Sequence, residues 1–213
     1  MQQEFVQEVK NTVTELLNGV HTAIPGKIVK YYPDKCEAEI LPFCKFKKPN
    51  GEFIDYPQLN HIPILFPQSM GQDCTMVYPI NPGDECLILA QEQTLDTWRG
   101  GGSESNNDLR FDLTNAVAIM GMFAKPQPLA QEAQDEDKII IQKNDHRIHI
   151  KPDELMVRYS PANFILLNPT GMTIKTQILN IAADMINTVS ATTITEAAGV
   201  SITETAPAIN LNP

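Results

Sequence analysis

Residues 171–175 read GMTIK, and residues 199–203 read GVSIT, 28 residues further along the chain. In both segments a glycine precedes apolar side chains that alternate with polar ones, which is the period of two that is typical of a half-buried β-strand. The surrounding sequence is rich in Thr, Ile and Val and contains no proline between Thr170 and Ala206. This pattern predicts the turns and strands of a β-solenoid or an intertwined β-prism.

These expected strands have almost no aromatic residues to cover their apolar face, so a single copy could not bury it. We therefore expect several identical chains to wind about one axis, and three is the smallest number that closes a tube around a filled centre. The predicted core of this homotrimer consists of Met172, Ile174, Val200 and Ile202. An ordinary sandwich of short strands is the alternative interpretation.

The composition is that of a globular, acidic protein. The chain has 213 residues, of which 42% are hydrophobic and 20% are charged, and its net charge is -10. A nucleic-acid partner would require neutralisation of phosphates, so this charge argues against one. The sequence has no apolar run of membrane-spanning length, and its first residues lack the pattern of a secretion signal. We expect synthesis and assembly in a bacterial cytoplasm.

An amphipathic helix is expected over residues 1–20. Phe5, Val9, Val13 and Leu16 recur at intervals of three and four residues, and Gly19 stands where a helix commonly ends. The resulting apolar stripe must be covered either by the following domain or by a partner.

Residues 21–124 are expected to form a small closed barrel such as an OB-fold. Residues 27–32 and 36–41 are separated by a Pro33-Asp34 turn and predict a hairpin. Further strands are expected at 62–66, 75–78 and 85–90, and the apolar run 111–123 closes the domain.

The rest of the chain divides into a loop, a connector and a shaft. Residues 98–107 are polar and glycine-rich, which predicts a mobile loop. Residues 125–137 contain two prolines, several glutamines and four acids, and predict a connector. The trimeric β-helical shaft is expected over 138–213, beginning with strands at 139–150 and 155–159.

No motif in the sequence predicts catalysis or metal binding. The four cysteines, Cys36, Cys44, Cys74 and Cys86, include no C-x-x-C spacing, and we interpret them as buried thiols. The histidines at positions 146 and 149 would point to opposite faces of a strand. The lysines at 45, 47 and 48 form a small basic patch, interpreted as a solvated loop or an assembly contact. We expect neither an enzyme nor a cofactor.

Several segments resemble the N-terminal OB domain of phage baseplate central spike proteins of the Gp138 and gpV type. These segments are residues 27–40, the turn and strand at 78–89, and residues 95–98 and 111–116. The order of an OB domain before a β-helical half is also that of the family. The resemblance implies a trimeric needle at the tip of a contractile tail or related injection machine.

The resemblance also implies partners and a location. The OB domains would attach to the tail hub of a virion baseplate or a secreted particle, and the needle would be driven through the outer membrane of the target cell. Phe5, Val9, Val13 and Leu16 would then contact the hub or another baseplate protein. The alternative is an OB-fold adaptor module for sugar, protein or nucleic acid, with a C-terminal half that only trimerises it.

The tip of the needle is expected to hold no metal. Spikes of the resembled family often end in a His-x-His pair that binds iron, but the last histidine here is His149. We expect Ile209 and Leu211 from three chains to fill the axis at the apex. A blunt, uncharged end of this kind also fits a separate tip protein.

Overall fold

The computed structural model describes residues 2–48, 50–104 and 109–190, together with residues 192, 193, 195 and 197. The chain divides into two compact units, residues 1–135 and residues 136–213. The predicted connector at 125–137 therefore spans the boundary between them. It also contains a helix that the sequence did not lead us to expect, α3 (Pro128–Asp135).

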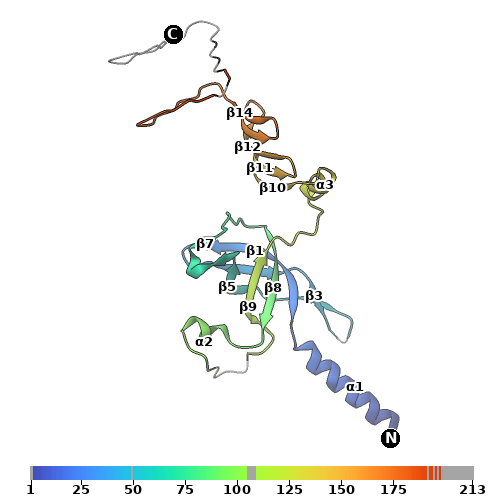
Figure 1. Ribbon diagram of the computed structural model, residues 1–213. Coiled ribbons are helices and arrows are strands. Elements are labelled where there is room, and N and C mark those ends of the chain that lie inside the picture. Colours follow the sequence, from blue (N-terminus) through green and yellow to red (C-terminus); the bar gives the residue numbers. More distant parts are fainter. Residues whose placement is uncertain are drawn as a thin grey trace. The chain divides into compact units, whose positions relative to one another are not determined.

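The first unit is built on a closed five-stranded barrel (Figure 1). The strands run in the order β1-β2-β5-β9-β8, and β5 and β9 pair in parallel while the other pairs are antiparallel. This is an OB-like arrangement, as predicted. The barrel strands are β1 (Ala23–Tyr32), β2 (Glu37–Pro42), β5 (Leu59–Leu65), β8 (Glu85–Gln91) and β9 (Asp112–Met120).

The shorter elements of this unit connect the barrel strands. They are α1 (Gln2–Asn18), β3 (Lys45–Lys47), β4 (Phe53–Asp55), β6 (Gln68–Ser69), η1 (Met70–Gln72), β7 (Cys74–Thr75) and α2 (Leu95–Arg99). β3 pairs with β4, and β6 pairs with β7. No described helix is long and apolar enough to cross a membrane.

Strand β1 closes the barrel because it pairs with β2 along one edge and with β8 along the other. Gly26 and Lys27 pair in both ladders, and Gly26 lies opposite Pro42 on β2 and Cys86 on β8. A Cβ atom at Gly26 would lie 2.6 Å from Cδ1 of Ile88 and 2.7 Å from Cγ2 of Ile40, two fully buried side chains. Only glycine fits there without displacing the core.

Two expectations for the first unit require correction. Residues 76–78 are not strand: β7 ends at Thr75, and the following segment leads to Pro79, which has no N–H to donate to a ladder. Trp98 belongs to α2 rather than to a loop. Backbone bonds from Gly100 to the carbonyl of Asp96 and from Gly102 to that of Thr97, both 2.9 Å long, end that helix.

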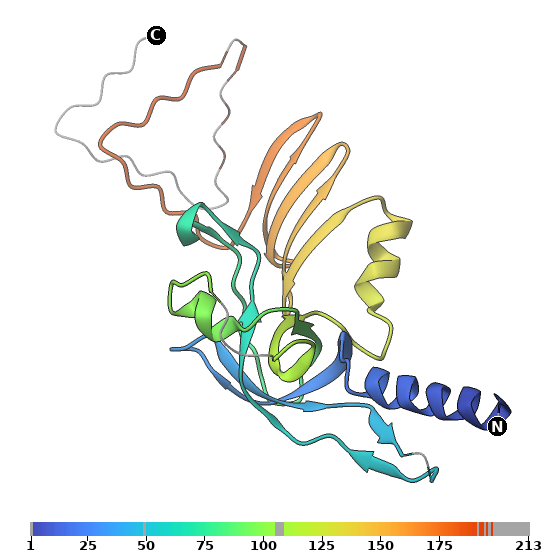
Figure 2. The ribbon, with the colours of Figure 1, turned by 90° about the horizontal axis from the view of Figure 1, so that it is seen from below.

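The second unit contains a five-stranded antiparallel sheet in which each strand pairs with the next (Figure 2). The predicted strand over 139–150 is in fact two strands, because Asn144 adopts a positive φ of 53° and the chain turns there. The intertwined β-helix stays a prediction. The strands are β10 (Ile139–Lys143), β11 (His146–Lys151), β12 (Glu154–Ser160), β13 (Asn163–Asn168) and β14 (Gly171–Lys175).

The close packing around Gly26 makes a prediction. Replacing Gly26→Ala should lower the free energy of unfolding of the barrel by about 1–3 kcal/mol, because the added methyl group overpacks Ile40 and Ile88. Thermal unfolding followed by scanning calorimetry measures the change. Gly19→Ala is the matched control, since its new Cβ would lie 3.5 Å from the carbonyl oxygen of Leu16, an ordinary contact. Equal stability of the two variants would contradict this account of the barrel closure.

Candidate functional site: an apolar assembly surface

One face of the sheet in the second unit carries two rows of apolar side chains that cross all five strands. Alternate residues of a strand share a face, and the pairing register aligns those of neighbouring strands. The first row is Ile139, Ile150, Leu155, Leu167 and Met172. The second row is Ile141, Ile148, Val157, Ile165 and Ile174. We call these ten side chains the apolar face.

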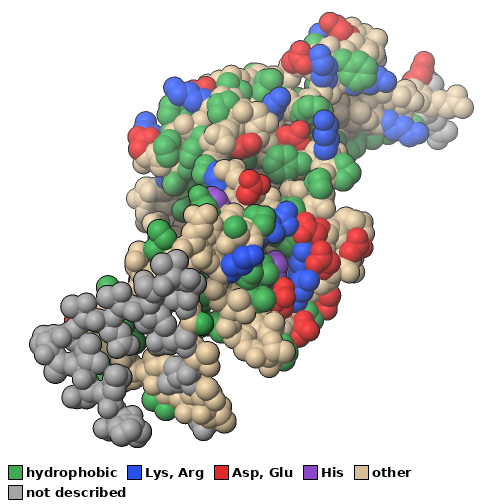
Figure 3. Space-filling view, turned by 90° about the horizontal axis from the view of Figure 1, so that it is seen from above, with side chains coloured by type: hydrophobic (Ala, Val, Ile, Leu, Met, Phe, Trp, Pro, Cys, Tyr) green, Lys and Arg blue, Asp and Glu red, His purple; other side chains and the backbone are tan. Residues whose placement is uncertain are grey.

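The apolar face is uncovered in the single chain. Its ten residues are between 37% and 64% exposed, although fully apolar side chains on a regular sheet normally face a core. The space-filling view shows hydrophobic side chains (green) at the surface among charged ones (Figure 3). A contiguous apolar surface of this kind indicates a contact with another molecule.

The opposite face mixes polar side chains with apolar ones such as Ile140, Met156 and Leu166, and most of its side chains are half-buried. Arg147, His149 and Lys151 on β11 and Arg158 on β12 are all half-buried, whereas their apolar neighbours along each strand are exposed. Long polar side chains that lie across one another can shield their own stems in this way. In the single chain the mixed face is therefore the better covered one, and the wholly apolar face is the exposed one.

Local polar contacts hold the first hairpins of this sheet in register. Nε2 of His149 lies 2.9 Å from Oε1 of Glu154 on the next strand. The carboxylate of Glu136 lies 2.8 Å from Nζ of Lys151 and 3.1 Å from Nζ of Lys138. Hydrogen bonds from Lys151 and Lys138 lower the pKa of Glu136 to about 2.

The two histidines of β11 point to opposite faces, as expected from their spacing. The ring of His146 stacks on Tyr159 with centroids 4.4 Å apart, and its Nδ1 donates to the carbonyl oxygen of Tyr159 over 2.9 Å. His149 pairs with Glu154 on the other face. Among the described residues, no three His, Cys, Asp or Glu side chains gather as a metal site would require.

Two of the predicted core residues lie on the apolar face. The other eight side chains of that face were not predicted. Met172 and Ile174 lie on β14, at the edge of the apolar face. The eight further members precede residue 168, and their alternation in the strands could have identified them. The remaining predicted core and tip residues lie outside the residues that the structure describes: Val200, Ile202, Ile209 and Leu211.

A second exposed apolar surface lies on helix α1. Every described side chain of this helix is exposed, including the predicted contact residues Phe5, Val9, Val13 and Leu16. The stripe therefore lies on one side of α1 without being buried by its own unit. Nothing in the structure assigns it to a hub, so that contact stays a prediction.

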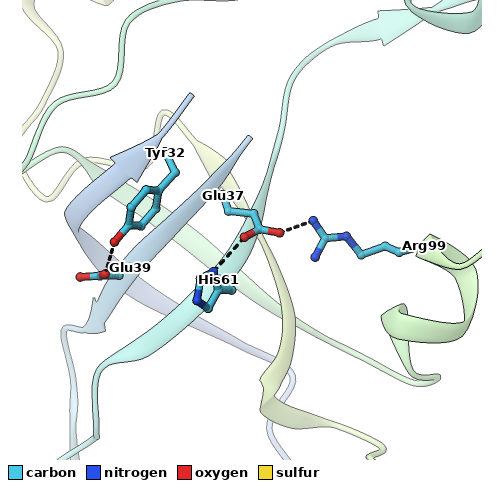
Figure 4. A network of polar contacts seen from close by, with 5 residues as sticks. All are labelled: Tyr32, Glu37, Glu39, His61 and Arg99. Atoms are coloured by element: carbon cyan, nitrogen blue, oxygen red, sulfur yellow. Dashed lines mark hydrogen bonds and ion pairs between the residues drawn. The ribbon is translucent and has the colours of Figure 1, made fainter. Parts of the chain in front are cut away.

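A buried ionic network joins the barrel to α2 (Figure 4). Glu37 on β2 is only 7% exposed and accepts a hydrogen bond from the guanidinium of Arg99. Nδ1 of His61 lies 3.0 Å from the other oxygen of Glu37. Beside it, the hydroxyl of Tyr32 donates to Glu39 over 2.5 Å. Glu37 and Arg99 are 62 positions apart in the sequence, and their hydrogen bond fixes α2 against the outer face of β2.

The carboxylate of Glu37 stays ionised because of these partners. Burial alone would raise the pKa of Glu37. The hydrogen bonds and positive charges of Arg99 and His61 outweigh burial and hold this pKa below its ordinary value. His61 has a positive φ of 59°, uncommon for a residue with a side chain, within an irregularity of the β2–β5 ladder. The bulge lets the imidazole reach Glu37.

Three of the four cysteines are not buried, contrary to expectation. Cys36, Cys44 and Cys74 are exposed, because they lie in turns or short hairpins at the edges of apolar runs. Only Cys86, in the centre of β8, is buried, and burial raises the pKa of its thiol to about 11. Hydrophobic neighbours in sequence do not by themselves place a residue inside the barrel.

The basic patch near residue 47 is largely neutralised within its own hairpin. Nζ of Lys45 lies 3.0 Å from Asp55, and Nζ of Lys48 lies 3.0 Å from Glu52. Both pairs join the two arms of the β3–β4 hairpin. This arrangement offers little free positive charge to a phosphate backbone.

The barrel also has a small apolar cavity of about 120 Å³. The carboxylate of Glu85 at its edge accepts a hydrogen bond from the backbone N–H of Ala124 over 2.5 Å. Phe43 and Phe123 are both more than half exposed. The cavity is lined by Pro25, Gly26, Phe43, Glu85, Met122, Phe123 and Ala124.

The ionic network predicts a pH-dependent effect of losing Arg99. Arg99→Met leaves the Glu37 carboxylate buried without its cation and should destabilise the barrel by about 1–3 kcal/mol at pH 7. The pKa of Glu37 is depressed in the folded state, so its stabilising effect exists above the unfolded pKa of about 4.3 and is lost as the pH falls through the folded value. The difference between variant and parent should therefore shrink as the pH falls below the unfolded pKa of Glu37.

Unfolding of both proteins in urea between pH 7 and pH 3 tests this expectation. Lys35→Met removes an exposed cation from the same unit and should have little effect at any pH. A loss of stability in Arg99→Met that is the same at both pH values would mean that packing of the side chain, rather than its charge, holds α2.

The comparisons with known proteins concern the barrel. A search of the curated proteins finds no match to this chain. A scan against protein families matches residues 24–121, which include the five barrel strands except for Ala23 at the start of β1, to a phage protein family. The barrel is thus similar to the phage protein Gp138 N-terminal domain.

Proposed function

We propose that this protein is the trimeric central spike of a contractile tail baseplate or a related injection machine. Its barrel unit attaches to the tail hub, and its second unit forms a needle that pierces the outer membrane of the target cell. The function is mechanical and involves no catalytic step. The protein is assembled in the bacterial cytoplasm and acts on the virion or on a secreted particle.

The observation that carries this proposal is the uncovered apolar face. Complete burial of one Leu or Ile side chain contributes about 1.5–3 kcal/mol, so covering ten half-exposed ones contributes on the order of 10 kcal/mol per chain. When three copies surround one axis, the apolar face of each chain is covered by the other two. The assembly is then closed, so no apolar face stays exposed. The similarity of the barrel to a phage protein domain supports a structural role in a phage particle.

This arrangement also suits a needle. Strands that are held between three chains cannot leave one at a time without exposing their apolar side chains and their backbone groups. Unfolding must therefore disrupt all three chains together, which makes the assembly kinetically stable under load. A force applied along the axis is then resisted by many backbone hydrogen bonds at once.

An adaptor role is the second candidate, favoured by the cavity that Phe43 and Phe123 border on the barrel. An OB-like barrel that binds a partner there would need its second unit only for trimerisation. Such an adaptor should keep its function when the residues after 176 are deleted, provided that trimers persist. A spike should lose infectivity with the same deletion.

Placing a charge on the apolar face tests the trimer directly. Ile174→Asp would bury three carboxylates without partners on the axis, so trimers that resist unheated SDS should be lost. Thr173→Asp is the matched control, because residue 173 precedes Ile174 on the same strand and points to the opposite face. The control should retain SDS-resistant trimers.

Gel electrophoresis without heating compares the two variants with the parent. Trimers that persist in Ile174→Asp would show that the apolar face is not at the centre of the assembly. Loss of trimers in both variants would show that β14 tolerates no charge on either face, which contradicts the assignment of an inner and an outer side.

A further inference from the structure

Helix α1 carries a seam with the spacing of a coiled coil. Its apolar residues Val6, Val9, Val13 and Leu16 are separated by three, four and three positions, which corresponds to positions a and d of a heptad repeat. All four are between 46% and 69% exposed in the single chain. We call these four side chains the α1 seam.

The positions farthest from the α1 seam are all polar. In the middle of the helix the seam is narrow, because Val9 and Val13 are flanked by Lys10 and Thr12. A narrow stripe of this kind is typical of a coiled coil, whereas a helix that lies on a globular surface has a broader one. The residues of heptad positions b, c and f are Glu4, Gln7, Glu8, Asn11, Thr14, Glu15 and Asn18.

We propose that the α1 helices of three chains pack together through this seam as a parallel coiled coil. This inference depends on the proposed trimer, which supplies three identical helices at high local concentration. The seam contains no charge, so copies of it do not repel one another. Val6 at a and Val9 at d are both β-branched, the arrangement that with Ile shifts coiled coils toward trimers and tetramers. Val13 with Leu16 has the two-stranded pattern, so the number of helices comes from the proposed trimer.

The exposure of α1 favours a partner. This helix of 17 residues spans about 25 Å, and helices in proteins gain most of their stability from packing an amphipathic face, which the described side chains of α1 do not do within the single chain. Phe5 and Leu17 flank the two ends of the seam at positions g and e, where a third helix would also contact them. The proposal replaces the expected hub contact of this stripe with contacts between copies of this chain.

Disulfide crosslinking in the full chain tests the proposal. The exposed cysteines are first replaced by Cys36→Ser, Cys44→Ser and Cys74→Ser, and the buried Cys86 is kept. Either Val9→Cys in the seam or Asn11→Cys on the outer side is then added. After mild oxidation, chains are boiled in SDS without reductant, and the covalent dimer is quantified. The native mass of each sample is measured in parallel.

The seam variant should give about tenfold more covalent dimer than the outer variant, because a disulfide requires Cα atoms about 4.4–6.8 Å apart and only seam positions approach so closely. A trimeric mass with equal or absent crosslinking in the two variants would overturn the coiled coil and leave the trimer standing. That result would return the stripe to a hub protein. A monomeric mass would overturn both the trimer and the coiled coil.

Discussion

Burial of the apolar face of the sheet is the constraint on which this structure depends. Rows such as Ile141 to Ile174 align across five strands because each hairpin keeps its register, and a shift of one residue would turn every one of these side chains to the other face. In the single chain these rows stay exposed among the residues that the structure describes. The sheet therefore presents half of a core, and we propose that copies of the chain supply the other half.

The barrel follows the opposite principle. β1 closes it on both edges, and its core of side chains such as Ile28, Ile40 and Ile88 is complete within one chain. The ionic network of the barrel positions its elements more than it stabilises them. The attraction within a buried ion pair is largely offset by the cost of removing both charges from water. The pair of Glu37 with Arg99 fixes where α2 lies against β2. One chain thus combines a self-sufficient domain with a segment that we propose to be completed by its copies.

The sequence predicted what depends on local pattern. Alternation in β1 and β2 specified their hairpin, and the spacing of Val9, Val13 and Leu16 specified α1. The turn at Asn144 was missed because the apolar alternation continues on both sides of it and Asn accepts a positive φ without a glycine. The contact of Glu37 with Arg99 was missed for a different reason: it joins distant segments, and only the folded barrel brings them together. The exposure of Cys36 likewise follows from its place at the end of a tight turn.

The central claim is that copies of this chain cover the apolar face, and the mass of the full-length protein in solution tests it most directly. Native mass spectrometry of the purified chain at micromolar concentration should give three times the 23.7 kDa of one chain. A folded species at the mass of a single chain, with the sheet intact by circular dichroism, would contradict the account. The apolar face would then be stable in water without a partner.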